Sequence, residues 1–151
     1  MDRLLDHPRT GPLYLRQPDI AKMVIDAIHY REKDLKHYDL HAYVVMANHV
    51  HLLITPRVLV SKLMQSLKRF TGLEGNRMLG LAGPFWQDES YDRLVRDERE
   101  FQRIAHYIEK NPVNAGLAVS PEEFRWSSAW PIGNRPQVEQ PAPQLRHREV
   151  G

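Results

Sequence analysis

The apolar run YDLHAYVVMANHVHLLITP, residues 38–56, constrains the fold more than any other stretch. It is rich in Val, Ile, Leu, Tyr and Thr, which favour strands, and only Ala47-Asn48 interrupts it. Because Asn tolerates positive backbone φ, the pattern predicts two antiparallel strands joined by a tight hairpin. Alternation along the second strand then predicts a core face with Val50, Leu52 and Ile54, and an open face with His49, His51 and Leu53.

Helical spacing of apolar residues occurs on both sides of this hairpin. It predicts a helix from an N-cap at Asp19 to about residue 33, a second over 58–79, and a third over 97–110 that Pro112 stops. A short strand is expected within 85–96, and the aromatic stretch 124–130 is expected to pack on the sheet. This order indicates an α+β fold, in which helices pack on a small antiparallel sheet.

The length of 151 residues corresponds to one domain. Aromatic residues end at Trp130 while prolines continue, so we expect a folded domain over 1–133 and a disordered tail over 134–151. The absence of cysteine excludes disulfides, a thiolate zinc site and a cysteine nucleophile. No apolar run reaches the roughly 18 residues of a membrane span, and residues 1–10 lack a signal-peptide pattern. We therefore expect a cytoplasmic protein with no membrane partner.

The net charge of +2 does not by itself indicate a nucleic-acid partner. Locally the balance differs, because the only acidic residue between positions 57 and 77 is Glu74. The basic residues of this stretch include Arg57, Lys62, Lys68 and Arg69. They could follow a phosphate backbone, although a solvated helix face has the same composition.

Two pairs of residues have spacings that suit chemistry. His49 and His51 are two residues apart on a predicted strand, so both imidazoles can face one metal ion; two polar residues on an open sheet face would look the same. Tyr107 and Asn111 are four residues apart on a predicted helix and share a face. A boundary tyrosine followed by a polar residue at a helix end is the simpler interpretation of that second pair.

Taken together, HVHLLI, FWQ-x-x-x-YD, YIEKNPVNAGL and WSSA resemble the single-tyrosine HUH transposases, and among these the REP-associated tyrosine transposases. The resemblance covers roughly residues 40–129. It implies a ferredoxin-like or RRM-like sheet and a domain over 1–133 that cuts and rejoins DNA. The implied nucleophile is Tyr107, and the implied ligands of a divalent metal ion, Mg²⁺ or Mn²⁺, are His49, His51 and Asn111.

The implied substrate is single-stranded or hairpin DNA of the REP palindromic type, cut through a covalent 5′-phosphotyrosine. Arg57, Lys62, Lys68 and Arg69 would hold its phosphates. The protein would act as a monomer or a homodimer. Two alternatives are a hairpin-binding protein of the same fold that no longer cuts, and a histidine-triad nucleotide hydrolase. The second alternative is disfavoured because its third histidine would fall at Leu53.

The family has a strand before its first helix, but residues 1–18 offer only Leu13–Leu15 as a strand segment. We therefore expect either that this tripeptide supplies the strand or that the sheet lacks it. A missing strand would be encoded upstream of Met1, or its loss would leave an exposed edge and a weakly stable chain.

Overall fold

The computed structural model describes residues 1–6, 13–86 and 91–131, so the predicted tail over 134–151 lies outside it. The strands are β1 (Arg3–Asp6), β2 (Tyr38–Val45), β3 (Val50–Pro56) and β4 (Tyr91–Leu94). The α-helices are α1 (Pro18–Lys33), α2 (Val60–Leu79) and α3 (Glu98–Asn114), and two short 3-10 helices are η1 (Tyr14–Arg16) and η2 (Pro121–Glu123). None of the helices in these ranges is long and apolar enough to cross a membrane.

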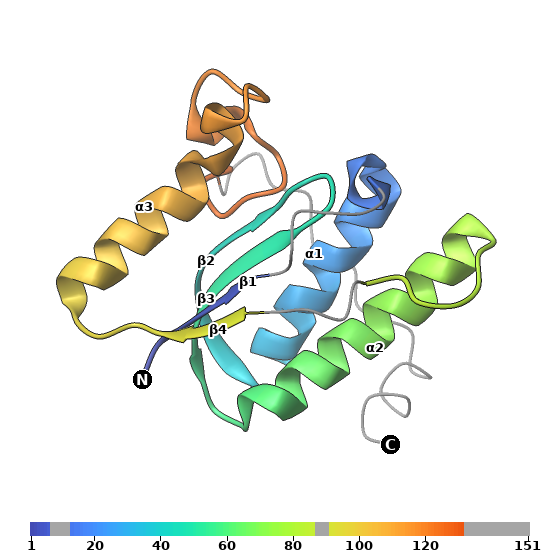
Figure 1. Cartoon of the computed structure of the whole chain (residues 1–151), viewed down its shortest axis with the longest axis horizontal. Helices are drawn as coiled ribbons and strands as arrows, with labels where there is room; N and C mark the ends of the chain where they lie inside the picture. The colour runs from blue at the N-terminus through green and yellow to red at the C-terminus, as the bar shows by residue number, and fades with distance from the viewer. Residues whose placement is uncertain (7–12, 87–90, 132–151) are drawn as a thin grey trace.

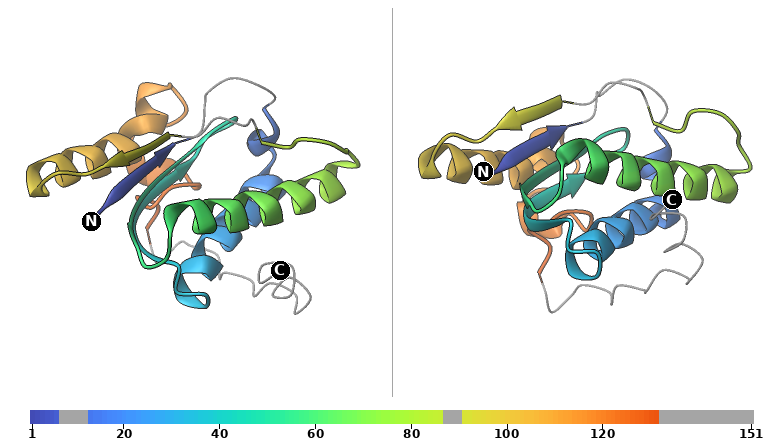
Figure 2. Two further views of the ribbon diagram at one scale, coloured as in Figure 1. Left: turned by 60° about the horizontal axis from the view of Figure 1, so that its bottom comes forward. Right: turned by 90° about the horizontal axis from the view of Figure 1, so that it is seen from below.

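The strands form one antiparallel sheet in the order β2-β3-β1-β4. Helices α1 and α2 cover one face of this sheet and α3 covers the other, so the molecule has three layers (Figures 1 and 2). Each face has its own apolar cluster, one under α1 and α2 and the other under α3. The predicted α+β class, with a small antiparallel sheet and helices packed on it, is confirmed.

The predicted hairpin is also present. Strands β2 and β3 pair along their length, and the backbone N–H of Met46 donates to the carbonyl of His49 across the Ala47–Asn48 turn at 2.8 Å. His49 lies in this turn, one residue before β3 begins.

The expectation that the face of β3 bearing the histidines is open is wrong. Helix α3 packs on that face through Ile104 and Ile108, and Leu53 is fully buried beneath it. The physical reason is that the apolar stripe of α3 also has to be removed from water, and α1 and α2 already cover the other face.

The expectation of a missing or displaced first strand is wrong as well. Strand β1 is Arg3–Asp6, and it lies in the middle of the sheet between β3 and β4. Tyr14 and Leu15 instead lie in η1, and Leu13 directly precedes it. Leu4 contributes to the apolar cluster under α3 and Leu5 to the one under α1 and α2. Two apolar residues between charged ones carry little strand signal, so pairing with two neighbours has to stabilise this strand.

Two predicted helix boundaries also need correction. Helix α1 is capped by Gln17 rather than by Asp19, and Pro18 occupies its first turn, where the fixed φ of proline suits a helix and no backbone N–H is needed. Helix α3 does not stop before Pro112 but continues to Asn114. A proline this close to the helix end removes one backbone hydrogen bond and leaves few later residues to disturb.

The segment after α3 returns to the edge of the sheet, as predicted for residues 124–130. Ser127 forms an isolated bridge with Val44 of β2, and the Ser128 hydroxyl lies 2.7 Å from a carboxylate oxygen of Glu109 on α3. This segment therefore links the outer edge of the sheet to the helix that carries Tyr107.

Candidate active site

The two histidines and the tyrosine singled out in the sequence lie together between β3 and α3. The ring centroids of His49 and His51 are 4.9 Å apart, and those of His51 and Tyr107 are 5.9 Å apart, both pairs edge to face. The two imidazoles are buried, whereas 41% of Tyr107 is exposed. The phenol thus lies beside the histidine pair at a position that solvent or a ligand can reach.

Asn48, in the hairpin turn, determines which tautomer His49 adopts. The Nδ1 atom of His49 lies 3.0 Å from Oδ1 of Asn48, an oxygen that can only accept a hydrogen bond. The proton of a neutral His49 is therefore on Nδ1, and the lone pair is on Nε2. A metal-binding histidine is normally held in this way, with one ring nitrogen donating to a neighbour and the other facing the metal.

The donor set fits a divalent cation. Two imidazoles bound to one cation, at an angle between a right angle and the tetrahedral angle, have ring centroids about 4.5–5.2 Å apart, and the observed 4.9 Å falls in this range. Asn111 is buried on α3 one turn beyond Tyr107, so its amide is on the same helix face. No group of three His, Cys, Asp or Glu side chains arranged to hold a metal occurs in the described ranges.

Three of the four predicted phosphate-binding residues lie on the other side of the sheet from this site, and the fourth, Arg57, follows the far end of β3. Lys62, Lys68 and Arg69 are on α2, whereas Tyr107 is on α3, which covers the opposite face of the sheet (Figure 1). Arg57 follows β3 and forms a bidentate ion pair with Asp39, in which Nε and Nη2 each donate to a carboxylate oxygen at 3.0 Å. These hydrogen bonds raise the pKa of Arg57. The fold therefore does not bring these four basic residues to the histidine–tyrosine site.

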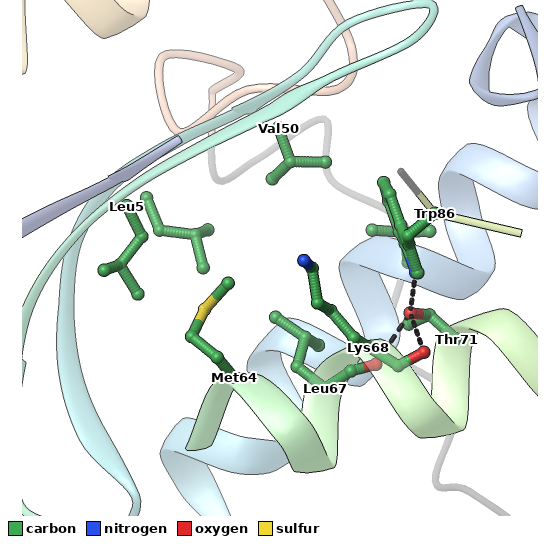
Figure 3. A pocket seen from close by; sticks show the side chains of 9 residues that line it. Leu5, Val50, Met64, Leu67, Lys68, Thr71 and Trp86 are labelled. Carbon is green, nitrogen blue, oxygen red and sulfur yellow. Dashed lines mark hydrogen bonds between the residues drawn. The ribbon is translucent and has the colours of Figure 1, made fainter. Parts of the chain in front are cut away.

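Lys68 does not extend outward with its neighbours on α2. Its ammonium group points into a small apolar cavity of about 30 Å³ between α2 and the sheet, toward Val50, Met64 and Trp86 (Figure 3). The Trp86 indole donates to the Thr71 hydroxyl at 2.7 Å at the side of this cavity. Lys62 and Arg69 are exposed, and Arg69 borders an open groove of about 570 Å³ along the outer side of α2.

A second basic cluster, which the sequence reasoning missed, lies on the same face as Tyr107. Three arginines, Arg93, Arg96 and Arg103, surround the carboxylate of Glu100 at the start of α3. The hydrogen bond from Arg96, with the nearby positive charges, lowers the pKa of the Glu100 carboxyl. The run RLVRDEREFQR was the available signal, but its alternating charges look like an ordinary solvated helix start.

Comparison with known proteins bears on the family and the fold of the chain. A family model described as "Transposase IS200 like" matches residues 14–111, well over half of the chain. The structure of a REP-associated tyrosine transposase bound to a REP hairpin is similar, with 18% identity, a TM-score of 0.64 and coverage of 92% of this chain and 87% of that one.

A transposase candidate from Deinococcus radiodurans R1 has 20% identity, a TM-score of 0.48 and coverage of 73% of this chain and 89% of its own. No curated protein matches the chain. The family match and the shared fold lead to one conclusion: the chain belongs to the IS200-like transposase family of enzymes that cut and rejoin DNA.

Proposed function

We propose that the protein is a metal-dependent single-stranded DNA endonuclease and strand transferase that acts on hairpin DNA of the REP type through Tyr107. The observation that carries the proposal is the position of the Tyr107 ring, 5.9 Å from His51, which in turn lies 4.9 Å from His49. A nucleophile and a pair of metal-ligand side chains that are more than fifty residues apart in the sequence thus lie side by side.

The chemistry needed is attack by a hydroxyl on a phosphodiester without loss of the bond energy. The Oη atom of Tyr107 forms a bond to phosphorus, the bond from phosphorus to the 3′-oxygen breaks, the phenolic proton passes to water, and the leaving 3′-oxygen takes a proton from water. The products are a 5′-phosphotyrosine and a free 3′-OH, and attack by a 3′-OH reverses the step. The exposure of Tyr107 suits this role, because a DNA strand has to reach the phenol.

His49, His51 and Asn111 would hold Mg²⁺ or Mn²⁺. Two nitrogen ligands and an amide oxygen suit Mn²⁺ better, and they leave room for phosphate oxygens. When bound, the cation polarises the scissile phosphate and stabilises the charge that develops on it. The Asn48 contact prepares His49 by placing its proton on Nδ1.

Hairpin DNA with unpaired flanks is the substrate that fits best. The similar REP-associated tyrosine transposase was solved with a REP hairpin, and an unpaired flank of such a hairpin could reach the exposed phenol of Tyr107. Lys62 and Arg69 would contact phosphates of the paired stem from the α2 side, with Lys68 beside them, and Arg57 would do so from the end of β3. We expect a monomer or a homodimer.

The nucleophile is tested with a labelled hairpin that has single-stranded flanks, incubated with Mn²⁺ and analysed for covalent protein–DNA adduct. We expect Tyr107→Phe to abolish both the adduct and the nick while hairpin affinity changes little. Tyr14→Phe is the matched control, because it removes a hydroxyl on the α1 and α2 side of the sheet and should cut normally. Cleavage by Tyr107→Phe at the normal rate would refute the assignment.

The metal site is tested by calorimetric Mn²⁺ binding as well as by cleavage. His49→Ala and His51→Ala should each weaken Mn²⁺ binding and lower cleavage by orders of magnitude. Asn111→Ala should have a milder effect because water can replace an amide oxygen. His106→Ala, an exposed histidine next to Tyr107 in the sequence, is the control. Normal Mn²⁺ affinity in both histidine variants would reject the site.

A further inference from the structure

The start of α3 carries an unusual charge arrangement around Glu100. Its carboxylate is only 3% exposed, and Oε2 lies 3.0 Å from Arg96, 3.6 Å from Arg103 and 3.7 Å from Arg93. The other oxygen accepts the backbone N–H of Arg96 at 3.1 Å. One buried carboxylate is therefore shared by three guanidinium groups from β4, the following turn and α3.

Three arginines against the carboxylates of Glu100 and of Asp97, which also acts on Arg96, leave an excess of one positive charge in this cluster. The arginines are 53%, 77% and 68% exposed for Arg93, Arg96 and Arg103, so most of each guanidinium faces solvent. A carboxylate that holds several arginines in fixed orientations, without neutralising them, reduces the entropy lost when they bind a further anion. Phosphate is an anion that the planar guanidinium group binds through two parallel hydrogen bonds.

The position of the cluster relative to Tyr107 indicates which phosphates it meets. Glu100 and Tyr107 are seven residues apart on α3, about two turns, and so lie on one face of the helix. Arg103 is one turn, about 6 Å along the axis, from Tyr107. A strand that runs from the phenol toward the start of α3 passes the arginines, whereas the basic residues of α2 lie across the sheet.

We infer that Arg93, Arg96 and Arg103, oriented by Glu100, form a binding site for the phosphates of single-stranded DNA next to the phosphate that Tyr107 attacks. This inference rests on the proposed function for the position of the scissile phosphate. It assigns two separate DNA contacts to the two sides of the sheet: the unpaired strand on the α3 side and the stem on the α2 side.

The test measures DNA affinity against salt concentration in the full chain, using fluorescence anisotropy. The background is Tyr107→Phe in EDTA, so no cleavage occurs and no metal is involved. The probe is a labelled hairpin with thymidine flanks on both ends, compared with the same hairpin without flanks. Each single-strand phosphate that a variant no longer neutralises should lower the slope of log K against log salt by about 0.7.

We expect Arg103→Gln to lower the slope by about 0.7 and the affinity by about fivefold at about 0.1 M salt, with the flanked probe only. Arg93→Gln combined with Arg103→Gln should lower the slope by about 1.4, and Arg103→Lys should restore it. The control is Arg99→Gln, which removes an equal charge from the preceding turn of α3 and leaves the three arginines around Glu100 in place. Its slope should equal that of the background.

Three results would overturn the inference: equal slopes for Arg103→Gln and Arg99→Gln, a change that persists with the unflanked hairpin, or no recovery in Arg103→Lys. Thermal melting of each variant identifies one that fails to fold, and Arg93→Gln then takes the place of Arg103→Gln. Because binding is measured without metal or cleavage, failure of the proposed reaction leaves this measurement intact. Normal cleavage with unchanged slopes rejects the arginine site alone.

Discussion

Replacement of Leu5 by Ala tests whether β1 is the central strand. Leu5 is 2% exposed, pairs in register with Leu52 of β3, and borders the small cavity of about 30 Å³ below α2. Removing its isobutyl group enlarges an existing cavity that β1, held by a strand on each side, cannot move to fill. We therefore expect a loss of about 3–4 kcal/mol in the free energy of unfolding, within the usual range for a buried leucine.

Urea unfolding followed by circular dichroism measures this loss, with an unchanged m-value showing that the two-state behaviour is kept. The melting temperature should fall by about 10 °C. Leu13→Ala is the control, because Leu13 is 45% exposed and its replacement should cost less than about 0.5 kcal/mol. A loss below about 1 kcal/mol for Leu5→Ala, or an equal loss for Leu13→Ala, would refute the placement of β1.

Two glycines of α2 should respond in opposite ways to alanine. A Cβ at Gly75 would lie 2.6 Å from the Phe85 ring, so Gly75→Ala should destabilise the fold by about 1–3 kcal/mol. The nearest atom to a Cβ at Gly72 is 3.6 Å away, so Gly72→Ala should stabilise the fold by up to about 1 kcal/mol through helix propensity. Equal shifts in the urea midpoint would contradict this packing. The hydrogen bond from Arg96 lowers the pKa of Glu100 in the folded state. The ionised carboxylate therefore stabilises the fold at a pH above the pKa that Glu100 has in the unfolded chain, and this stabilisation is lost as the pH falls toward its pKa in the folded chain. The melting temperature of the native chain should therefore drop more between about pH 5 and about pH 3 than that of Glu100→Gln, and parallel drops would show that the carboxylate contributes nothing.

Local pattern alone determined a large part of this protein. The alternation and strand propensity of residues 38–56, with Asn48 in the turn, were enough to predict the hairpin of β2 and β3. The three- and four-residue spacings were enough for the three helices, because a continuous apolar stripe is a property of the sequence itself. Tyr107 and His51 could also be singled out, since their spacings relative to Asn111 and His49 are local.

The tertiary structure decided what depends on contacts between distant segments. Strand β1 has a weak local signal and exists because β3 and β4 pair with it from both sides. The face that carries His51 is closed by α3, whose stripe had no other sheet face available. The topology of the fold, and not the charge of a residue, decides on which side of the sheet that residue lies. The sequence therefore could not show that the basic residues of α2 and the arginines around Glu100 lie on opposite sides.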